Sequence, residues 1–391
     1  MLRTVTDSWQ LSFASGGADA LELMKQARVD AIVSDMAMPE MDGAQLLALV
    51  QSSYPSTARL ILSGRTDPDT VLDVVRSAQQ FLAKPCDAQT LTTAVSQALS
   101  VQLALNDPSL RDLIGGVNAL PTLPVVYDQI VAAVARENVR LSDIADIISS
   151  DIGTSAEILK LVNSAFFGLP REVYSVEAAV GLLGLDNIQA LVLTSSLFHV
   201  NDALAWVLDV EDLGKQSLLR AGVARAIAQL EGWAGPERDI AVLSCMLRDV
   251  GRLVLAEGRP EATQHLQSCI DSEPTPPSAT RLGELETEAY GCTVAQASAY
   301  LLGLWRFTSA VVRTVAVFPL PTMDAATKFD RVLDFASART RNPNDPYTPP
   351  LDEYLTEERV RAWNLAADHV LLESLAGDSD SEPATRRDGH R

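Results

Sequence analysis

A change of pattern near residue 120 constrains the fold of this chain more than any other feature. Before it, short, mostly apolar segments alternate with amphipathic ones. The strand-like segments are 9–14, 31–33, 59–62 and 81–83, and the helix-like segments are 19–27, 43–52, 69–78 and 90–99. Short apolar strands separated by amphipathic helices predict a parallel sheet with helices on both faces.

After residue 120 the strand signal almost disappears. Apolar residues recur with helical spacing in 125–135, 141–148, 155–162, 176–183, 188–198, 217–230, 240–247 and 294–304. This spacing predicts an all-helical domain. We expect an α/β domain over 1–100, a linker helix over 101–118 and an all-α domain over 119–320. A helical extension over 321–375 and a disordered polar tail over 376–391 would complete the chain.

Composition excludes several classes of protein. The chain has 31 Lys and Arg against 51 Asp and Glu, a formal net charge of −20, which disfavours non-specific binding to nucleic acids and anionic membranes. It has neither an apolar run long enough to span a bilayer nor the apolar core of a signal peptide. Its four cysteines form no CxxC pair. Together these features predict a cytoplasmic protein.

Three polar residues follow predicted parallel strands: Asp35, Ser63 and Lys84. The carboxyl ends of parallel strands meet at one edge of the sheet, where ligands bind. A carboxylate, a hydroxyl and an ammonium group at this edge suit phosphoryl transfer to the carboxylate. Asp35 would be the nucleophile, Lys84 would neutralise phosphoryl charge and Ser63 would donate a hydrogen bond.

The strings VSDMAMPEMDG (33–43), LSG (62–64) and FLAKP (81–85) resemble the receiver domain of two-component response regulators, over about residues 9–100. The resemblance implies a flavodoxin-like sheet in which Asp35 accepts a phosphoryl group from a histidine kinase. It also implies that Ser63 and Phe81 form a switch pair and that Lys84 contacts the phosphoryl group. The alternative is that these residues only terminate strands of a flavodoxin-like fold.

One departure concerns the magnesium ion that a complete receiver uses. Receivers open with an apolar strand that ends in adjacent acidic residues, whereas here only Asp7 precedes Trp9. The first strand is therefore expected to be missing, and Asp35 alone is a poor Mg²⁺ ligand set. Either the chain starts too far downstream or this receiver has lost phosphorylation. In both cases we expect the chain as given to be labelled poorly by phosphodonors.

The helical region carries DIADIISSD (143–151), ILKLVNSAFFG (158–168), VEAAVGLLG (176–184) and RDVGRL (248–253). These strings resemble the HDOD domain, a relative of the HD phosphohydrolases, over about residues 113–320. A receiver joined to an HDOD domain is a known layout of bacterial response regulators. The resemblance therefore implies a signalling protein rather than an isolated enzyme.

The HDOD region lacks the histidines that an HD hydrolase uses to hold a divalent metal. The chain has four histidines, His199, His265, His369 and His390, and none lies at a metal-ligand position of the hydrolase pattern. The degenerate HD positions are Gln216, Arg248, Asp249, Arg252 and Val294. Arginine stays protonated and cannot coordinate a metal. We therefore expect no cofactor in this domain and no hydrolysis.

Three weaker signals have structural interpretations. Asn163 and Ser164 follow an apolar helix and are expected to cap its end, with ligand binding as the alternative. Residues 142–162 could form a helix-turn-helix, but the second helix offers one cation and one anion, too few charges for DNA. The alternating acids Glu284, Glu286 and Glu288 are expected to form a solvated face.

The sequence thus favours a response regulator whose HDOD output domain is non-catalytic. Phosphorylation of Asp35, or partner binding, would shift the packing of receiver on helical domain. A helix from Thr90 through Leu103 toward Leu113 is the expected coupling element. Partners would be a histidine kinase, a downstream protein such as a sensor kinase or a cyclic-dinucleotide enzyme, and a second copy in a homodimer. The alternatives are a divalent-metal phosphohydrolase and a DNA-binding regulator.

Overall fold

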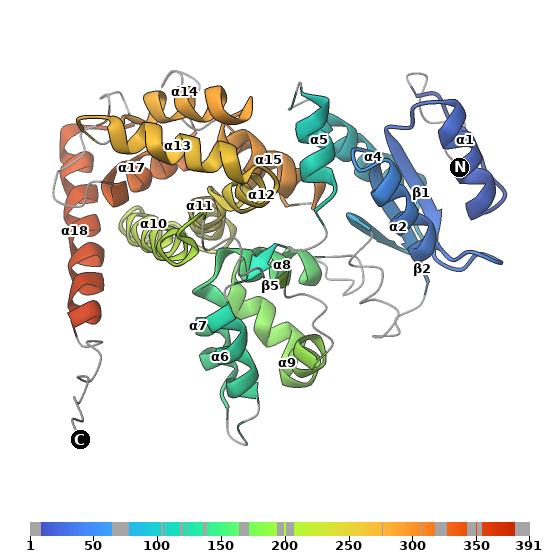
Figure 1. Ribbon diagram of the computed structural model, residues 1–391. Helices are drawn as coiled ribbons and strands as arrows, with labels where there is room; N and C mark the ends of the chain where they lie inside the picture. Colours follow the sequence, from blue (N-terminus) through green and yellow to red (C-terminus); the bar gives the residue numbers. More distant parts are fainter. Residues whose placement is uncertain are drawn as a thin grey trace, which may run out of the picture.

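A computed structural model describes residues 9–64, 78–102, 105, 107–117, 120–122, 124–134, 136, 139–163, 172–193, 199–200, 207–275, 277–305, 307–316, 327–341, 349 and 354–379. An α/β domain lies at one end of the molecule and a larger helical body at the other, with helix α5 (Pro108–Gly115) between them (Figure 1). No helix in the described part of the chain is both long and apolar enough to cross a lipid bilayer.

The α/β domain contains a parallel sheet of strands β1 (Ala31–Asp35), β2 (Ala58–Ser63) and β3 (Gln80–Ala83), in that order. Helices α1 (Gly17–Gln26), α2 (Gly43–Ser53) and α4 (Ala88–Gln102) surround it. Successive strand residues point to opposite faces: Leu60 packs in the core under α4, and Ile61 packs with Leu47 of α2. The predicted α/β fold is confirmed.

The expected strand at residues 9–14 does not form. This segment has no strand assignment, although Trp9 is half-buried against the core shared by the sheet and α4. A strand needs a neighbour to satisfy its backbone hydrogen bonds, and none of the described strands pairs with this segment. Most of the helix predicted at 69–78 lies outside the described residues.

The coupling helix expected to run from Thr90 toward Leu113 is interrupted. Helix α4 ends at Gln102, and α5 starts afresh at Pro108. The Asp107 carboxylate caps the new helix by accepting a hydrogen bond of 2.8 Å from the Ser109 N–H. Proline lacks the N–H that would continue a preceding helix but suits the first turn of a new one.

The helical body contains two lobes, α6–α9 and α10–α18, that lie one below the other in Figure 1. The first lobe has α6 (Pro124–Val134), α7 (Leu141–Ser149), α8 (Ile152–Val162) and α9 (Val176–Leu193). The second has α10 (Val210–Leu230), α11 (Pro236–Leu247), α12 (Val250–Gly258), α13 (Pro260–Ser272), α14 (Ala279–Tyr290), α15 (Val294–Leu304), α16 (Ser309–Ala316), α17 (Lys328–Arg341) and α18 (Glu357–Ser379).

The structure adds three details to the predicted helical region. Strands β4 (Pro121–Thr122) and β5 (His199–Val200) form a very short parallel pair. Helix α9 is kinked at Gly184, whose φ of 72° lies in the left-handed region. Helix α18 also continues to Ser379, past the expected end of the helical extension.

The hydrophobic core is continuous from the α/β domain into the helical body. One cluster joins Leu47 of α2 to Leu110 and Ile114 of α5, and these to Leu301 of α15. A second cluster, centred on the fully buried Trp363 of α18, attaches α17 and α18 to α10 and α11. The free energy gained from hydrophobic burial is roughly proportional to the apolar area removed from water. The shared core therefore lets the two domains stabilise each other.

Candidate functional site

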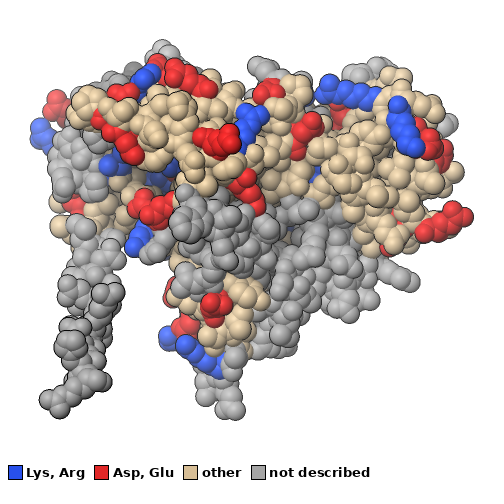
Figure 2. Space-filling view, in the orientation of Figure 1, with Lys and Arg blue, Asp and Glu red and all other residues tan. Residues whose placement is uncertain are grey.

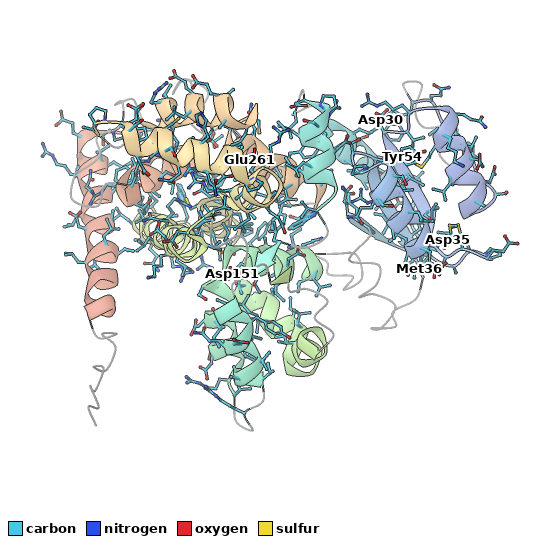
Figure 3. All side chains as sticks on the ribbon, in the orientation of Figure 1. Asp30, Asp35, Met36, Tyr54, Asp151 and Glu261 are labelled. Carbon is cyan, nitrogen blue, oxygen red and sulfur yellow. The ribbon has the colours of Figure 1, made fainter. Side chains whose placement is uncertain are left out.

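The carboxyl edge of the sheet brings Asp35 and Lys84 together as the sequence predicts. The Lys84 ammonium group forms an ion pair with Oδ2 of Asp35, and the Ala37 N–H donates a 3.1 Å hydrogen bond to Oδ1. Both side chains of the pair are about two-fifths exposed. Figure 3 places Asp35 and Met36 at the tip of the α/β domain, far from the helical body. A phosphodonor can therefore reach this carboxylate from solvent.

The other predicted members of this site are placed by the backbone. Ser63 ends β2, is half-buried, and lies beside Ala83 in the sheet; its carbonyl accepts a 2.8 Å hydrogen bond from the Lys84 N–H. Phe81 is part of β3, but its side chain lies outside the described atoms. The Lys84–Pro85 peptide bond is cis.

Helix α2 fixes the loop that follows Asp35. Asp42 accepts a 2.8 Å bond from the Gln45 N–H, and the Gln45 side chain accepts a 3.2 Å bond from the Asp42 N–H. This capping box starts the helix at Gly43. A Cβ on Gly43 would overlap the Asp35 carbonyl oxygen, so only glycine allows α2 to approach the strand end this closely.

The residues present do not fit a magnesium site. Mg²⁺ prefers an octahedron of oxygen ligands, in which one or two carboxylates bind it alongside several retained waters. Asp35 is the acid that the sequence analysis placed at this edge. Its Oδ2 already accepts a hydrogen bond from Lys84, and its Oδ1 accepts one from the Ala37 N–H. Over the described ranges, no cluster of three or more His, Cys, Asp or Glu side chains could hold a metal.

Three of the degenerate HD positions, Arg248, Asp249 and Arg252, belong to a buried cluster of ion pairs. Asp249 is 4% exposed and forms ion pairs with Arg220 of α10, at 2.6 Å, and with Arg248, at 3.2 Å. Arg252 of α12 lies 3.7 Å from Glu286 of α14. Two guanidinium groups therefore surround the one acid that an HD enzyme would use as a ligand.

Electrostatics keep this acid charged. Burial raises the pKa of the Asp249 carboxyl, but the charges of Arg220, Arg248 and Arg252 lower it by more, so it lies well below its usual range. Burial raises the pKa of Glu286, and Arg252 offsets this only in part. A carboxylate that arginines neutralise is a poor ligand for a further cation.

Sequence reasoning missed two members of this cluster. Glu286 was expected on a solvated face but is 4% exposed, and its Oε2 accepts a 2.9 Å hydrogen bond from the N–H of Val294, a degenerate HD position. Arg220 carries no motif. Gln216 lies one turn before Arg220 on the same helix, so the two residues share a face. This spacing was the available sign that Arg220 could lie near the other HD positions. Gln216 itself is half-buried on α10.

Helix α8 cannot serve as a DNA-recognition helix because all of its residues are buried. Its one cation, Lys160, lies 3.4 Å from its one anion, Glu157, and 4.0 Å from the ring centre of Trp305. Glu157 also accepts a 3.0 Å hydrogen bond from the Leu120 N–H. These charges hold the helical body together and cannot reach a phosphate backbone.

Asn163 ends α8 and ties down the following segment, as predicted. Its amide donates to the Val173 carbonyl and its oxygen accepts from the Val173 N–H, each at 2.7 Å. Both groups of the amide are therefore used structurally. Ser164 lies outside the described residues.

A second set of contacts, which the sequence did not reveal, joins the two domains. Arg59, at the start of β2, is 1% exposed and donates a 2.8 Å hydrogen bond to the Gly115 carbonyl at the end of α5. Gln79 donates to the same carbonyl at 3.4 Å, and Gln51 of α2 donates to the Gly116 carbonyl at 3.1 Å. The α/β domain thus caps the carboxyl end of α5.

This capping suits the physics of a helix end. The last carbonyls of a helix lack intrahelical partners and carry partial negative charge, so a guanidinium group is a favourable partner. Arg59 also donates to the carbonyls of Pro55 and Thr57, at 3.0 and 3.2 Å. A Cβ on Gly115 would overlap the Pro55 carbonyl oxygen, so glycine is required where the elements meet. We call these contacts the Arg59 clamp.

Comparison with known proteins agrees with both halves of the molecule. Residues 2–96 match the response regulator receiver domain, and residues 120–318 match the HDOD domain. The MmoQ response regulator from Methylococcus capsulatus has a similar fold, with a TM-score of 0.51 and 23% identity over 66% of this chain and 98% of that one.

Curated relatives match a shorter stretch. The transcriptional regulatory protein GlrR of Escherichia coli is 30% identical over 158 residues, which are 40% of this chain and 34% of GlrR. The luminescence regulatory protein LuxO of Vibrio campbellii is 26% identical over 153 residues, 38% of this chain and 32% of LuxO. The match thus spans about a third of these relatives. Since the HDOD model covers half of the sequence and a receiver precedes it, this chain belongs to the HDOD-domain proteins and is a response regulator.

Proposed function

We propose that the HDOD domain is a non-catalytic output module that acts through protein–protein contact. The observation that supports this is the pairing of Asp249 with Arg220 and Arg248 in the interior. A hydrolase would need this carboxylate, together with imidazoles, to hold a metal that activates water. Here two guanidinium groups take the place of the metal charge.

The proposed division of the chain follows the expectation from sequence. The receiver occupies 1–100, the linker that contains α5 occupies 101–118, and the HDOD domain occupies 119–320. The extension over 321–375 packs on the HDOD helices through the cluster around Trp363 and through the ion pairs of Lys328 with Glu237 and of Arg359 with Glu231. We therefore treat the extension as part of the output module.

We further propose that Asp35 is the phosphoacceptor and that a histidine kinase is the donor. A carboxylate oxygen of Asp35 would attack the phosphorus of the phosphohistidine, the P–N bond would break, and an acyl phosphate would form. The ammonium group of Lys84, which is paired with Asp35, would neutralise the new phosphoryl oxygens. Ser63 would donate a hydrogen bond to one of them, and Phe81 would follow its movement. Because Asp35 belongs to no metal-binding cluster among the described residues, we expect weak labelling.

Strand β2 is the proposed route from this edge to the output module. It carries Ser63 at its carboxyl end and Arg59 near its start. A shift of β2 changes the distance from Arg59 to the Gly115 carbonyl and hence the position of α5. Helix α5 packs on α12 and α15 of the HDOD domain. The two domains would therefore move between two packed arrangements rather than separate.

Metal analysis of the purified full chain tests the non-catalytic output. After incubation with Mn²⁺ or Fe²⁺ and desalting, we expect metal content far below one ion per chain, both for the wild type and for Asp249→Asn. Metal at near-stoichiometry that is lost in Asp249→Asn would contradict the proposal and favour the phosphohydrolase. Arg361→Gln, a change at an exposed arginine of α18, is the matched control.

A further inference from the structure

A groove between the receiver and the linker helix has no role in the functions described above. Its volume is about 460 Å³, within the range of small-molecule sites. Its walls come from the end of α1, the α1–β1 loop, the α2–β2 loop and the first half of α5. Figure 3 shows Asp30 and Tyr54, which line it, on the part of the receiver that faces α5.

Arg111 of α5 is the unusual residue of this groove. Its Nε atom is buried and makes no hydrogen bond, and none of the described residues forms an ion pair with its guanidinium group. Leaving a buried donor of a charged group unsatisfied is costly. A donor of a charged group left unsatisfied in this way indicates a missing partner.

The facing wall adds positive charge. Lys25 and Arg28 line the groove from the receiver side, and their side chains are 62% and 71% exposed. Lys25 is paired with Glu22 and Arg28 with Asp30, so both are partly neutralised. Figure 2 shows Lys and Arg side chains at this upper edge of the receiver.

The remaining lining is suited to a flat apolar group. Tyr54 and Pro55 contribute from the α2–β2 loop, Pro108 from α5 and Val29 from the receiver. Asp112, which follows Arg111 and also lines the groove, can accept a hydrogen bond from a hydroxyl or N–H group. The lining therefore combines a rigid apolar surface, an unpaired cation and an acceptor.

From these observations we propose that the groove binds a small organic anion, with a planar ring against Tyr54 and the two prolines and a phosphate or carboxylate on Arg111. Such a ligand would contact the receiver and the linker helix at once. The bound ligand would strengthen or weaken the contact between receiver and α5 that the Arg59 clamp makes. It would do so at the edge of the sheet opposite Asp35. Binding itself does not depend on phosphorylation of Asp35 or on the non-catalytic role of the HDOD domain.

A matched pair of probes tests the proposal on the full chain. 1-Naphthyl phosphate carries the ring and the anion, and 1-naphthol carries the same ring without charge. Titration calorimetry should show that 1-naphthyl phosphate binds at one site and that Arg111→Gln weakens it about tenfold, as expected for one charge-assisted hydrogen bond. 1-Naphthol should bind more weakly than 1-naphthyl phosphate, and with the same affinity to the wild type and to Arg111→Gln. Because Arg111 has no protein partner, Arg111→Gln should fold normally.

Two further variants separate this site from non-specific binding. Ala27→Trp, a change at a residue that lines the groove, should prevent binding of both probes. Arg361→Gln, at an arginine remote from the groove in sequence and exposed on α18, should leave both affinities unchanged. The proposal is wrong if 1-naphthyl phosphate fails to bind the wild type, or if it binds Arg111→Gln or Ala27→Trp as tightly as the wild type.

Discussion

Replacement of Arg59 by methionine would test whether the clamp joins the two domains energetically. The change keeps an unbranched side chain of similar reach but removes three hydrogen bonds, to the carbonyls of Pro55, Thr57 and Gly115. Hydrogen bonds from a charged donor each contribute about 1.5–3 kcal/mol. Burial of the guanidinium group opposes them and lowers its pKa to about 10, so it remains charged at neutral pH.

The net effect follows from these opposing contributions. Gln79 still donates to the Gly115 carbonyl in the variant, so that group is not left wholly unsatisfied. We therefore expect Arg59→Met to lower the free energy of unfolding by about 2–4 kcal/mol. Arg59→Lys retains the charge but has only one nitrogen to donate. Its free energy of unfolding should lie between those of Arg59→Met and the wild type.

Urea unfolding followed by tryptophan fluorescence and by limited proteolysis is the assay. Trp9 lies in the receiver, whereas Trp233, Trp305 and Trp363 lie in the helical body. The wild type should unfold in one transition, and Arg59→Met should show earlier loss of the receiver with cleavage between α4 and β4. If Arg59→Met stays within about 0.5 kcal/mol of the wild type and of Arg361→Gln, the clamp does not couple the domains.

Asp249→Asn should destabilise the protein by about 3–5 kcal/mol at pH 7, because it leaves two buried guanidinium groups uncompensated. Since the folded pKa of Asp249 is depressed, its stabilisation is complete above the unfolded value near 4 and fades as the pH falls; urea midpoints of variant and wild type should converge below that pH. Asn163→Ala should lower the melting temperature through a loss of about 1–3 kcal/mol, and an unchanged melting curve would contradict the structural role assigned to its amide. Gly43→Ala should cost about 1–3 kcal/mol by pushing α2 away from the strand end, seen as a lower urea midpoint. Acetyl phosphate with Mg²⁺ should label the chain weakly and Asp35→Asn not at all; efficient labelling in the mass spectrum would refute the inference from the missing acids.

Local sequence patterns were sufficient to predict that Asp35 and Lys84 lie at one edge of the sheet. Asp35 and Lys84 were expected together because each follows an apolar strand, and parallel strands end at the same edge of a sheet. The strand expected at 9–14 failed because a strand depends on a neighbour and not on its own residues alone. The continuous coupling helix failed at Asp107 and Pro108, whose capping chemistry starts a new helix and could have been recognised.

The surroundings of Asp249 show a limit of the sequence. The absence of histidine nearby predicted that no metal is held there, but it did not identify the arginines that pair with Asp249. Arg220 and Glu286 come from helices far apart in the sequence, and neither carries a motif. Their burial follows from how α10 packs against α11 and α14 against α13, which no local pattern encodes.

The sequence by itself determined the two domain types, the order of most elements and the residues at the sheet edge, because strand and helix periodicity and strand-end positions are local properties. Only the tertiary structure decided how the domains are joined. The Arg59 clamp and the arginine pairs of Asp249 each unite residues from separate elements. Such contacts form when hydrophobic packing brings elements together and buried polar groups must then find partners, so they depend on the whole fold.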